Sequence, residues 1–316
     1  MDVLSVGMMV CDIPISPVPK QIFEMEKAEI IAPTKTTGGD ALNVAVTLAK
    51  LGAETAIVGR VGNDENGCFV VKKAAEADID VSGVIHDEEH QTAVSYLLID
   101  EEGEKHSLSD TRIYHRLNDS DVTDQAIQMA EIIYFGSAFQ MKQMDRGGIH
   151  RLFQRAHKYG KKTAMDTALT DDMEEREALL KILTPAFEET DVFLPSYKEA
   201  SYLSGQTDPE QIAVFFKRFG IKIFGVKLGD RGCYLTDYKE SMYLPSFHDF
   251  KVVDTTGAGD SFVGGFLKGL TLGWDLKECG KLASAVAAYN VAKKGATEGV
   301  PDWETVVSYL KKQEEK

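Results

Sequence analysis

Short apolar segments typical of β-strands alternate with helical segments along most of the 316-residue chain. VLSVGM, EIIYFGSA and IKIFGVKLG are strand-like runs, whereas ALNVAVTLAKLG and GGIHRLFQRAHKYG have the composition and spacing of helices. An alternation of this kind is typical of a parallel sheet whose two faces are covered by helices. The sequence therefore predicts a three-layer α-β-α sandwich around a mostly parallel central sheet.

Two segments interrupt this alternation. Residues 12–39 contain four prolines and no clear helix, and residues 91–110 follow a two-residue alternation and then turn at Glu102-Gly103, as in a β-hairpin. Because both segments lie between βα units, we expect them to form a small antiparallel sheet that covers the main sheet as a lid. The predicted lid comprises residues 12–35 and 91–114, and the predicted α/β core comprises residues 1–11, 36–90 and 115–316.

The charge balance and the cysteines narrow the classes of partner and compartment. The chain has 35 basic and 50 acidic residues, and its net charge of -15 argues against nucleic acid or an anionic membrane surface as a partner. Cys11, Cys68, Cys233 and Cys279 lie far apart and form no CxxC pair, which is typical of reduced thiols. The N-terminus has no basic region, and no apolar run approaches the length of a membrane span. We therefore expect a cytoplasmic protein.

The stretch KVVDTTGAGDSFVGGFLKG, residues 251–269, is the strongest chemical signal. FKVVD has the composition of a strand and SFVGGFLKGL that of a helix, so TTGAG would present free amides at the positive end of a helix. Such a junction is suited to binding a phosphate group. It also carries two carboxylates, Asp254 and Asp260, which would repel that phosphate unless one of them has another task.

Four interpretations of this loop compete. The chain has no GxxxxGK[ST] match, as a Walker P-loop would require, and a GxGxxG dinucleotide fingerprint would place its third glycine at Phe262. A helix N-terminus with an acidic first turn explains Asp260 but not the two glycines of GAG. Phosphoryl transfer explains both, because the amides would stabilise charge on the phosphate while Asp260 takes the proton of the attacking hydroxyl.

Several stretches resemble one enzyme family, in the same order. DTTGAGDSFVGGFL resembles the second signature of the PfkB/ribokinase family of carbohydrate kinases, and GGDALNVAVTLAKLG resembles its first. VGMMVCD, VGNDENG, VKLGDRGCYL and KKGATEGVP are similar to further family segments, so the resemblance covers nearly the whole chain. The resemblance implies a ribokinase-like fold and the ATP-dependent phosphorylation of a primary hydroxyl of a small carbohydrate.

The resemblance also implies roles for individual residues. It makes Asp260 the catalytic base, with the backbone amides of Gly257, Ala258, Gly259 and Asp260 as its anion hole. The positions that match the family's acceptor-binding residues are Asp12, Gly38, Gly39, Asp40 and Asn43. The positions that match its nucleotide segments are Ser196, Glu199, Lys227, Gly229, Gly232, Ser284 and Ala287.

The implied cofactors are ATP and Mg²⁺, and K⁺ for those members that a monovalent cation activates. Glu199 matches the glutamate of the family's NxxE motif, which arranges magnesium through its waters, and Ser196 stands in place of the asparagine of that motif. Asp254 and Thr256 match the positions whose oxygens help to bind the monovalent cation. Asp40 stands where ribokinases usually have lysine, and Val10 replaces an asparagine that ribokinases use on the sugar, so ribose itself is not the expected acceptor.

Other functions stay open at this level. A nucleoside kinase on the same fold would need aromatic stacking, for which Tyr96 or Phe139 could serve. A sugar-binding regulator without activity and a dinucleotide-dependent oxidoreductase are the alternatives from other classes. The resemblance further implies a homodimer through the lids, which the alternating apolar residues of 93–99 would permit.

Overall fold

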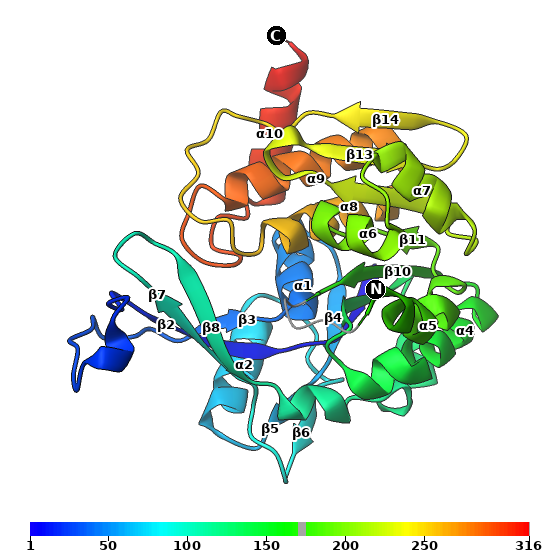
Figure 1. Cartoon of the computed structure of the whole chain (residues 1–316). Helices are drawn as coiled ribbons and strands as arrows, with labels where there is room; N and C mark the ends of the chain where they lie inside the picture. Colours follow the sequence, from blue (N-terminus) through cyan, green and yellow to red (C-terminus); the bar gives the residue numbers. More distant parts are fainter. Residues whose placement is uncertain (170–174, 316) are drawn as a thin grey trace.

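The computed structural model describes residues 1–169 and 175–315, and an eight-stranded sheet runs through its centre (Figure 1). In spatial order the strands are β14 (Ser241–Leu244), β13 (Cys233–Thr236), β12 (Ile223–Lys227), β11 (Val192–Phe193), β10 (Lys162–Thr167), β9 (Ile132–Ala138), β1 (Val3–Val6) and β4 (Thr55–Val58). The strands from β12 to β4 are parallel, whereas β13 and β14 are antiparallel additions at one edge.

Helices cover both faces of this sheet, as the strand–helix alternation predicts. One face packs against α1 (Asp40–Lys50), α8 (Ala258–Thr271) and α9 (Leu276–Asn290), with α10 (Trp303–Glu314) outside α9. The other face packs against α3 (Asp124–Met129), α4 (Ile149–Lys158), α5 (Arg176–Phe187), α6 (Tyr197–Ser204) and α7 (Pro209–Lys217). Along β9, Ile133 and Phe135 join the second of these cores and Ile132 and Tyr134 the first, since successive side chains of a strand point to opposite faces.

A second sheet has the order β3-β2-β7-β8 and lies beside α1 and α2 (Glu65–Glu76) (Figure 1). Its strands are β3 (Thr36–Gly38), β2 (Val10–Ile15), β7 (Val94–Ile99) and β8 (Lys105–Asp110). Strands β7 and β8 form the expected hairpin, but β2 and β7 are parallel, so the expectation of a purely antiparallel sheet is wrong. The fold class, a mostly parallel central sheet with helices on both faces and a small additional sheet, is confirmed.

The remaining elements are short. A two-stranded parallel sheet contains β5 (Arg60–Gly62) and β6 (Ile85–Asp87). The single-turn segments are η1 (Ile22–Glu24), η2 (Arg112–Arg116), η3 (Asp119–Asp121), η4 (Met144–Gly148) and η5 (Gly229–Arg231). Among the helices of residues 1–169 and 175–315, none combines the length and the apolar character needed to cross a bilayer.

One expected strand does not form. FKVVD has the composition of a strand, but residues 250–254 are irregular, and Val252 and Val253 are exposed. The backbone amides of Val253 and Asp254 donate to the carbonyl of Val291, beyond the end of α9, and not to a neighbouring strand. β-propensity alone produces no strand where the sheet offers no partner.

Candidate active site

The GAGD loop begins α8, with Gly257 as the N-cap at a φ of +70°. A Cβ atom on Gly257 would lie 2.0 Å from the carbonyl oxygen of Ala296, so both the backbone angle and the space require glycine. The amide of Ala258 donates to the carbonyl of Thr255 at 3.2 Å. The amides of Gly259 and Asp260 follow in the first turn of α8, where no carbonyl of the same helix is available to them. The positive end of α8 therefore lies at the start of this motif.

Helix α1 brings Asn43 to the first turn of α8. Asn43 Nδ2 donates a 2.8 Å hydrogen bond to Asp260 Oδ2, although the two residues are 217 positions apart. This requires close approach of the two helices, which Gly264 allows: a Cβ at Gly264 would lie 2.5 Å from Thr47 Cγ2. The small residues of SFVGGFL thus place the amide against the carboxylate.

Lys227 lies among carboxylates at the carboxyl ends of the parallel strands. It is the last residue of β12, and its Nζ forms a short ion pair with Asp166 Oδ2 near the end of β10. Burial disfavours the charged form of Lys227, but Asp166, Glu199 and Asp260 outweigh this effect and raise its pKa. A buried cation thus lies among carboxylates at the sheet edge where ligands bind in α/β proteins.

The carboxylates nearest the start of α8 titrate close to neutral pH. Burial raises the pKa of Asp260 to about 6, against the opposing effects of the Asn43 hydrogen bond and of Lys227. Burial and the charge of Asp260 raise the pKa of Asp40, the first residue of α1, to about 7. A carboxylate with a pKa near 6 can accept a proton from a reacting group at physiological pH.

The predicted acceptor residues converge on the junction of β3 and α1. Gly39 is the N-cap of α1, so Asp40 and Asn43 lie in its first turn. Asp12 faces this junction from β2, and a Cβ at Gly38 would lie 2.1 Å from Asp12 Oδ2. The structure therefore brings all five together.

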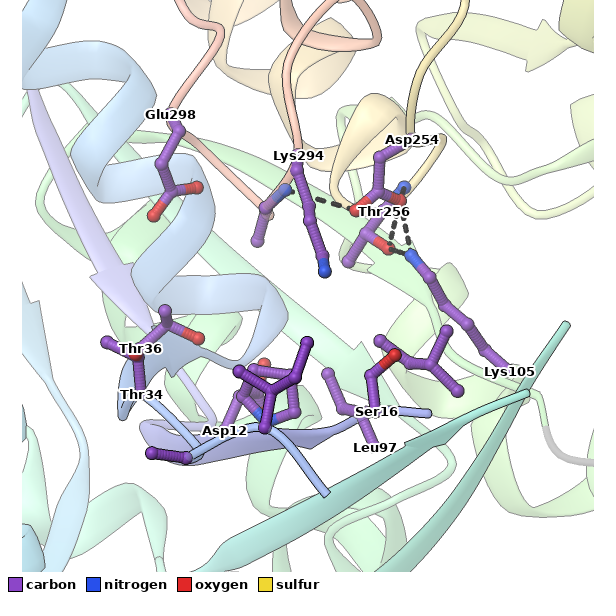
Figure 2. A pocket seen from close by; sticks show the side chains of 16 residues that line it. Asp12, Ser16, Thr34, Thr36, Leu97, Lys105, Asp254, Thr256, Lys294 and Glu298 are labelled. Atoms are coloured by element: carbon purple, nitrogen blue, oxygen red, sulfur yellow. Dashed lines mark hydrogen bonds and ion pairs between the residues drawn. The ribbon is translucent and has the colours of Figure 1, made fainter. Parts of the chain in front are cut away.

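A cavity of about 380 Å³ opens between the second sheet and the loops around residues 254–256 and 294–298 (Figure 2). Asp12 and Glu298 lie on its wall, together with Leu97 and Ile99 of β7. Asp260 is not among the lining residues, so the cavity lies beside the catalytic candidates and shares Asp12 with them. Burial raises the pKa of Asp12 to about 6, and the charges of Asp40 and Glu298 add to this shift.

The two predicted ligands of a monovalent cation face a lysine. Lys105, the first residue of β8, forms a short ion pair with Asp254 Oδ1, and its Nζ donates to Thr256 Oγ1 at 2.6 Å (Figure 2). Burial raises the pKa of Asp254, but hydrogen bonds from Lys105, Thr256 and Gly295 outweigh this and hold it down at about 2. These oxygens therefore already hold a positive charge that belongs to the chain, and an added monovalent cation does not fit the arrangement.

Comparison with known proteins identifies the family. The chain matches the pfkB family of carbohydrate kinases over residues 1–303. It belongs to that family. As a pfkB-family kinase it is a phosphotransferase that acts on an alcohol group, and membership excludes the oxidoreductase alternative.

Relatives of this pfkB-family kinase cover nearly its full length. The ATP-dependent 6-phosphofructokinase of Thermoanaerobacterium thermosaccharolyticum is 30% identical over 313 residues, which cover 97% of this chain and 93% of that protein. The Arabidopsis thaliana ribokinase complexed with ribose and ATP has a TM-score of 0.84 at 24% identity, and the match covers 98% of this chain and 99% of that chain. A candidate ribokinase II from E. coli, in complex with ATP and Mg²⁺, has a TM-score of 0.87 at 21% identity and covers 98% of this chain and 99% of its own. The two structures establish the ribokinase-like fold.

In this pfkB-family kinase the NxxE-like segment forms a capping box. Glu199 Oε2 accepts hydrogen bonds from the backbone amide and the hydroxyl of Ser196 at 2.9 and 2.6 Å, and Glu199 Oε1 accepts from the amide of Leu169 at 3.1 Å. The serine therefore orients the carboxylate, although it is shorter than the asparagine of the motif. Glu199 and the nearby Asp166 offer hard carboxylate oxygens, which suit Mg²⁺.

The other predicted nucleotide residues lie on two adjoining elements. Gly229 and Gly232 flank the turn between β12 and β13, directly after Lys227. Ser284 and Ala287 lie on α9, where the hydroxyl of Ser284 is 4.0 Å from the thiol of Cys233 on β13. Their role in binding the nucleotide stays a prediction.

Sequence reasoning missed two charged residues of the site. Asp166 lies next to the end of a buried strand in TAMDT, and a carboxylate at the carboxyl end of a parallel strand is a signal that could have identified it. Lys105 begins an exposed strand of the hairpin, and no local pattern connects it with Asp254.

Proposed function

We propose that this protein transfers the γ-phosphoryl group of ATP to a primary hydroxyl of a small carbohydrate, with Asp260 as the catalytic base. The observation that carries the proposal is the position of Asp260: a carboxylate with a pKa near 6 in the first turn of α8, oriented by Asn43. At that position the phosphate would lie against the first-turn amides of α8, and the acceptor hydroxyl would lie beside the Asp260 carboxylate.

The chain's own groups divide the work of in-line transfer. Asp260 takes the proton of the attacking hydroxyl, and the first-turn amides of α8 stabilise the charge on the transferring phosphoryl group. Lys227 places a positive charge beside these groups. Asp166 and Glu199 would hold Mg²⁺, directly or through water, and the bound ion neutralises charge on the phosphates.

Asn43 also supports an acceptor beside Asp260. Its Oδ1 atom is buried and has no hydrogen-bond partner within the described part of the chain. An unpaired buried acceptor is costly, and a sugar hydroxyl would satisfy it. Asp40 and Val10 replace the lysine and asparagine of ribokinases at this site, so we infer an acceptor other than ribose.

The nucleoside-kinase alternative would need Tyr96 or Phe139 to stack on the base of the acceptor. Leu97 and Ile99 line the cavity, so Tyr96, which directly precedes Leu97 in the same strand, points to the opposite face of the second sheet and cannot stack on a ligand there. Phe139 packs against the hydrophobic core. We infer that the acceptor is a sugar without a large aromatic base.

The second sheet is suited to act as a lid and as a dimer surface. Leu97 and Ile99 face the cavity, where closure of residues 12–35 and 91–114 would exclude water from the reaction.

On the outer face, Tyr96 lies opposite Leu108, and these side chains are 42% and 60% exposed. We infer a homodimer through this outer face, and not through the apolar positions 97 and 99. Light scattering of Leu108→Lys should show a monomer where the unaltered chain is a dimer.

We place the protein in the cytoplasm. All four cysteines are unpaired, and three of them are buried, as expected for a protein that is kept in a reducing compartment.

The direct test is ADP release with ATP and Mg²⁺ across pentoses, hexoses, sugar phosphates, keto-deoxy acids and nucleosides. We expect saturable turnover with a sugar and none with nucleosides. Turnover with a nucleoside alone would establish the alternative acceptor. Saturable sugar binding without turnover in the whole panel would contradict the proposal and favour a sugar-binding regulator.

A further inference from the structure

Lys105 crosses from the second sheet to the loop that precedes the GAGD motif. It begins β8 directly after the turn of the β7–β8 hairpin, and its Nζ reaches Asp254 and Thr256, 149 and 151 positions along the chain (Figure 2). In Figure 2 the dashed lines from Lys105 to Asp254 and Thr256 connect the hairpin with this loop, and all three residues line the cavity.

The side-chain oxygens of Asp254 and Thr256 around this ammonium all accept hydrogen bonds from groups of the chain. Asp254 Oδ1 accepts from the amide and the hydroxyl of Thr256 at 2.9 and 2.7 Å, as well as from Lys105. Asp254 Oδ2 accepts from the amide of Gly295 at 3.0 Å. Thr256 Oγ1 uses its proton on Asp254 and its lone pair on Lys105, so the hydroxyl completes the same network.

The buried carboxylate needs a positive partner. The Asp254 side chain is only 6% exposed, whereas that of Lys105 is 34% exposed, so the charge enters from the cavity side. A carboxylate this far from water is costly unless a cation pairs with it. An alkali cation could supply that charge by binding carboxylate, hydroxyl and carbonyl oxygens. In this chain a lysine occupies the position.

A buried amide fixes the same loops without a cation. Asn290 Nδ2 donates to the carbonyls of Thr256 and Ala296 at 3.2 and 2.8 Å, and Asn290 Oδ1 accepts from the amide of Gly299 at 3.2 Å. The segment before α8 is thereby tied to the segment after α9 by side-chain hydrogen bonds. Positioning of the anion-hole loop then depends on groups within the chain.

We propose that the ammonium of Lys105 replaces the activating monovalent cation, so that phosphoryl transfer by this protein is independent of K⁺. The inference rests on the proposed function. A tethered ammonium has the same charge as K⁺, and its local concentration is set by the hairpin and not by the surrounding salt. Because Lys105 belongs to the second sheet, the charge reaches Asp254 only when that sheet lies over the cavity.

The test compares the unaltered chain with Lys105→Met, which keeps the length of the side chain and removes its charge. Rates of ADP release are measured in potassium chloride and in tetramethylammonium chloride at equal ionic strength. The unaltered chain should show the same rate in both salts. Lys105→Met should lose about tenfold or more in tetramethylammonium and recover most of that loss in K⁺. Lys239→Met, which removes an exposed ammonium from the turn between β13 and β14, should behave like the unaltered chain.

Thermal unfolding provides a readout that does not depend on catalysis. The melting temperature of Lys105→Met should be lower in tetramethylammonium and rise with K⁺, whereas that of the unaltered chain should be equal in the two salts. Stimulation of the unaltered chain by K⁺ would overturn the inference. So would a Lys105→Met variant that is equally active in both salts, or inactive in both. If the unaltered chain phosphorylates nothing in the panel, the proposed function fails, and the melting comparison still decides whether Lys105 replaces the cation.

Discussion

Asn43 Nδ2 donates a 2.8 Å hydrogen bond to Asp260 Oδ2 and so joins the first turns of α1 and α8. The bond connects the two segments that carry the family resemblance, GGDALNVAVTLAKLG and DTTGAGDSFVGGFL. It holds one oxygen of the carboxylate and leaves Asp260 Oδ1 for a proton from the acceptor. The predictions below follow from this pair and from the loop that positions it.

Replacement of Asp260 by asparagine should abolish most of the activity while the fold is retained. The amide has nearly the same shape as the carboxylate but cannot take a proton. We expect kcat to fall by roughly 10²–10⁴-fold, the range for loss of a general base. ADP release measures the rate, and circular dichroism checks the fold. Near-normal turnover would show that another group is the base.

The pH–rate profile should have an acidic limb set by Asp260. The base works only when ionised, and its pKa is raised to about 6. We therefore expect kcat/KM to rise with pH up to about 6 and then level off. A profile that is flat between pH 5 and pH 8 would be inconsistent with this assignment.

The Asp260 carboxylate should lower the stability of the folded protein at high pH. Because the pKa of Asp260 is higher in the folded state than its ordinary value of 3.8, the folded protein binds the proton more tightly. The stabilisation that this provides is complete below pH 4 and is lost as the pH rises through about 6. Asp260→Asn should therefore raise the melting temperature more at pH 8 than at pH 5. An equal change at the two pH values would argue against a raised pKa.

Replacement of Asn43 by alanine should shift the acidic limb to higher pH. The hydrogen bond from Asn43 lowers the pKa of Asp260, so its removal lets burial raise that pKa further. The limb should move upward and KM for the sugar should increase. The double variant with Asp260→Asn should lose no more activity than Asp260→Asn alone, since the two residues act as a unit. Full additivity would show that Asn43 acts elsewhere.

Replacement of Gly257 by alanine should impair both stability and activity. The added Cβ would meet the carbonyl of Ala296 at 2.0 Å in a left-handed backbone conformation, at a cost of about 1–3 kcal/mol in the free energy of unfolding. Gly273→Ala is the matched control, because Gly273 has a similar φ of +72° with nothing within 4 Å of the new Cβ. Denaturant unfolding should show a clearly larger loss at position 257. Equal losses at the two positions would mean that the contact with Ala296 is relieved.

Much of the fold and part of the site could be predicted from the sequence. The alternation of segments predicts the sandwich, and Asp208 followed by Pro209 predicts the start of α7, where Asp208 caps the helix. FKVVD shows the limit, because its composition favours a strand but the chain reaches no open sheet edge there. The parallel pairing of β2 with β7 was missed for a related reason: periodicity describes each strand and not its neighbour.

The sequence by itself determined the elements that depend on a few consecutive residues. These include the glycine-rich start of α8, the helix caps and the β7–β8 hairpin, because backbone angles, capping hydrogen bonds and side-chain period act locally. Only the tertiary structure decided which charges meet. Lys227 pairs with Asp166 across 61 positions because the strand order of the central sheet brings β10 near β12, and Lys105 pairs with Asp254 across 149 because the second sheet lies against the loop before α8. No pattern within either segment encodes its partner, and for this reason the predicted cation site became, in the folded chain, the site of a lysine.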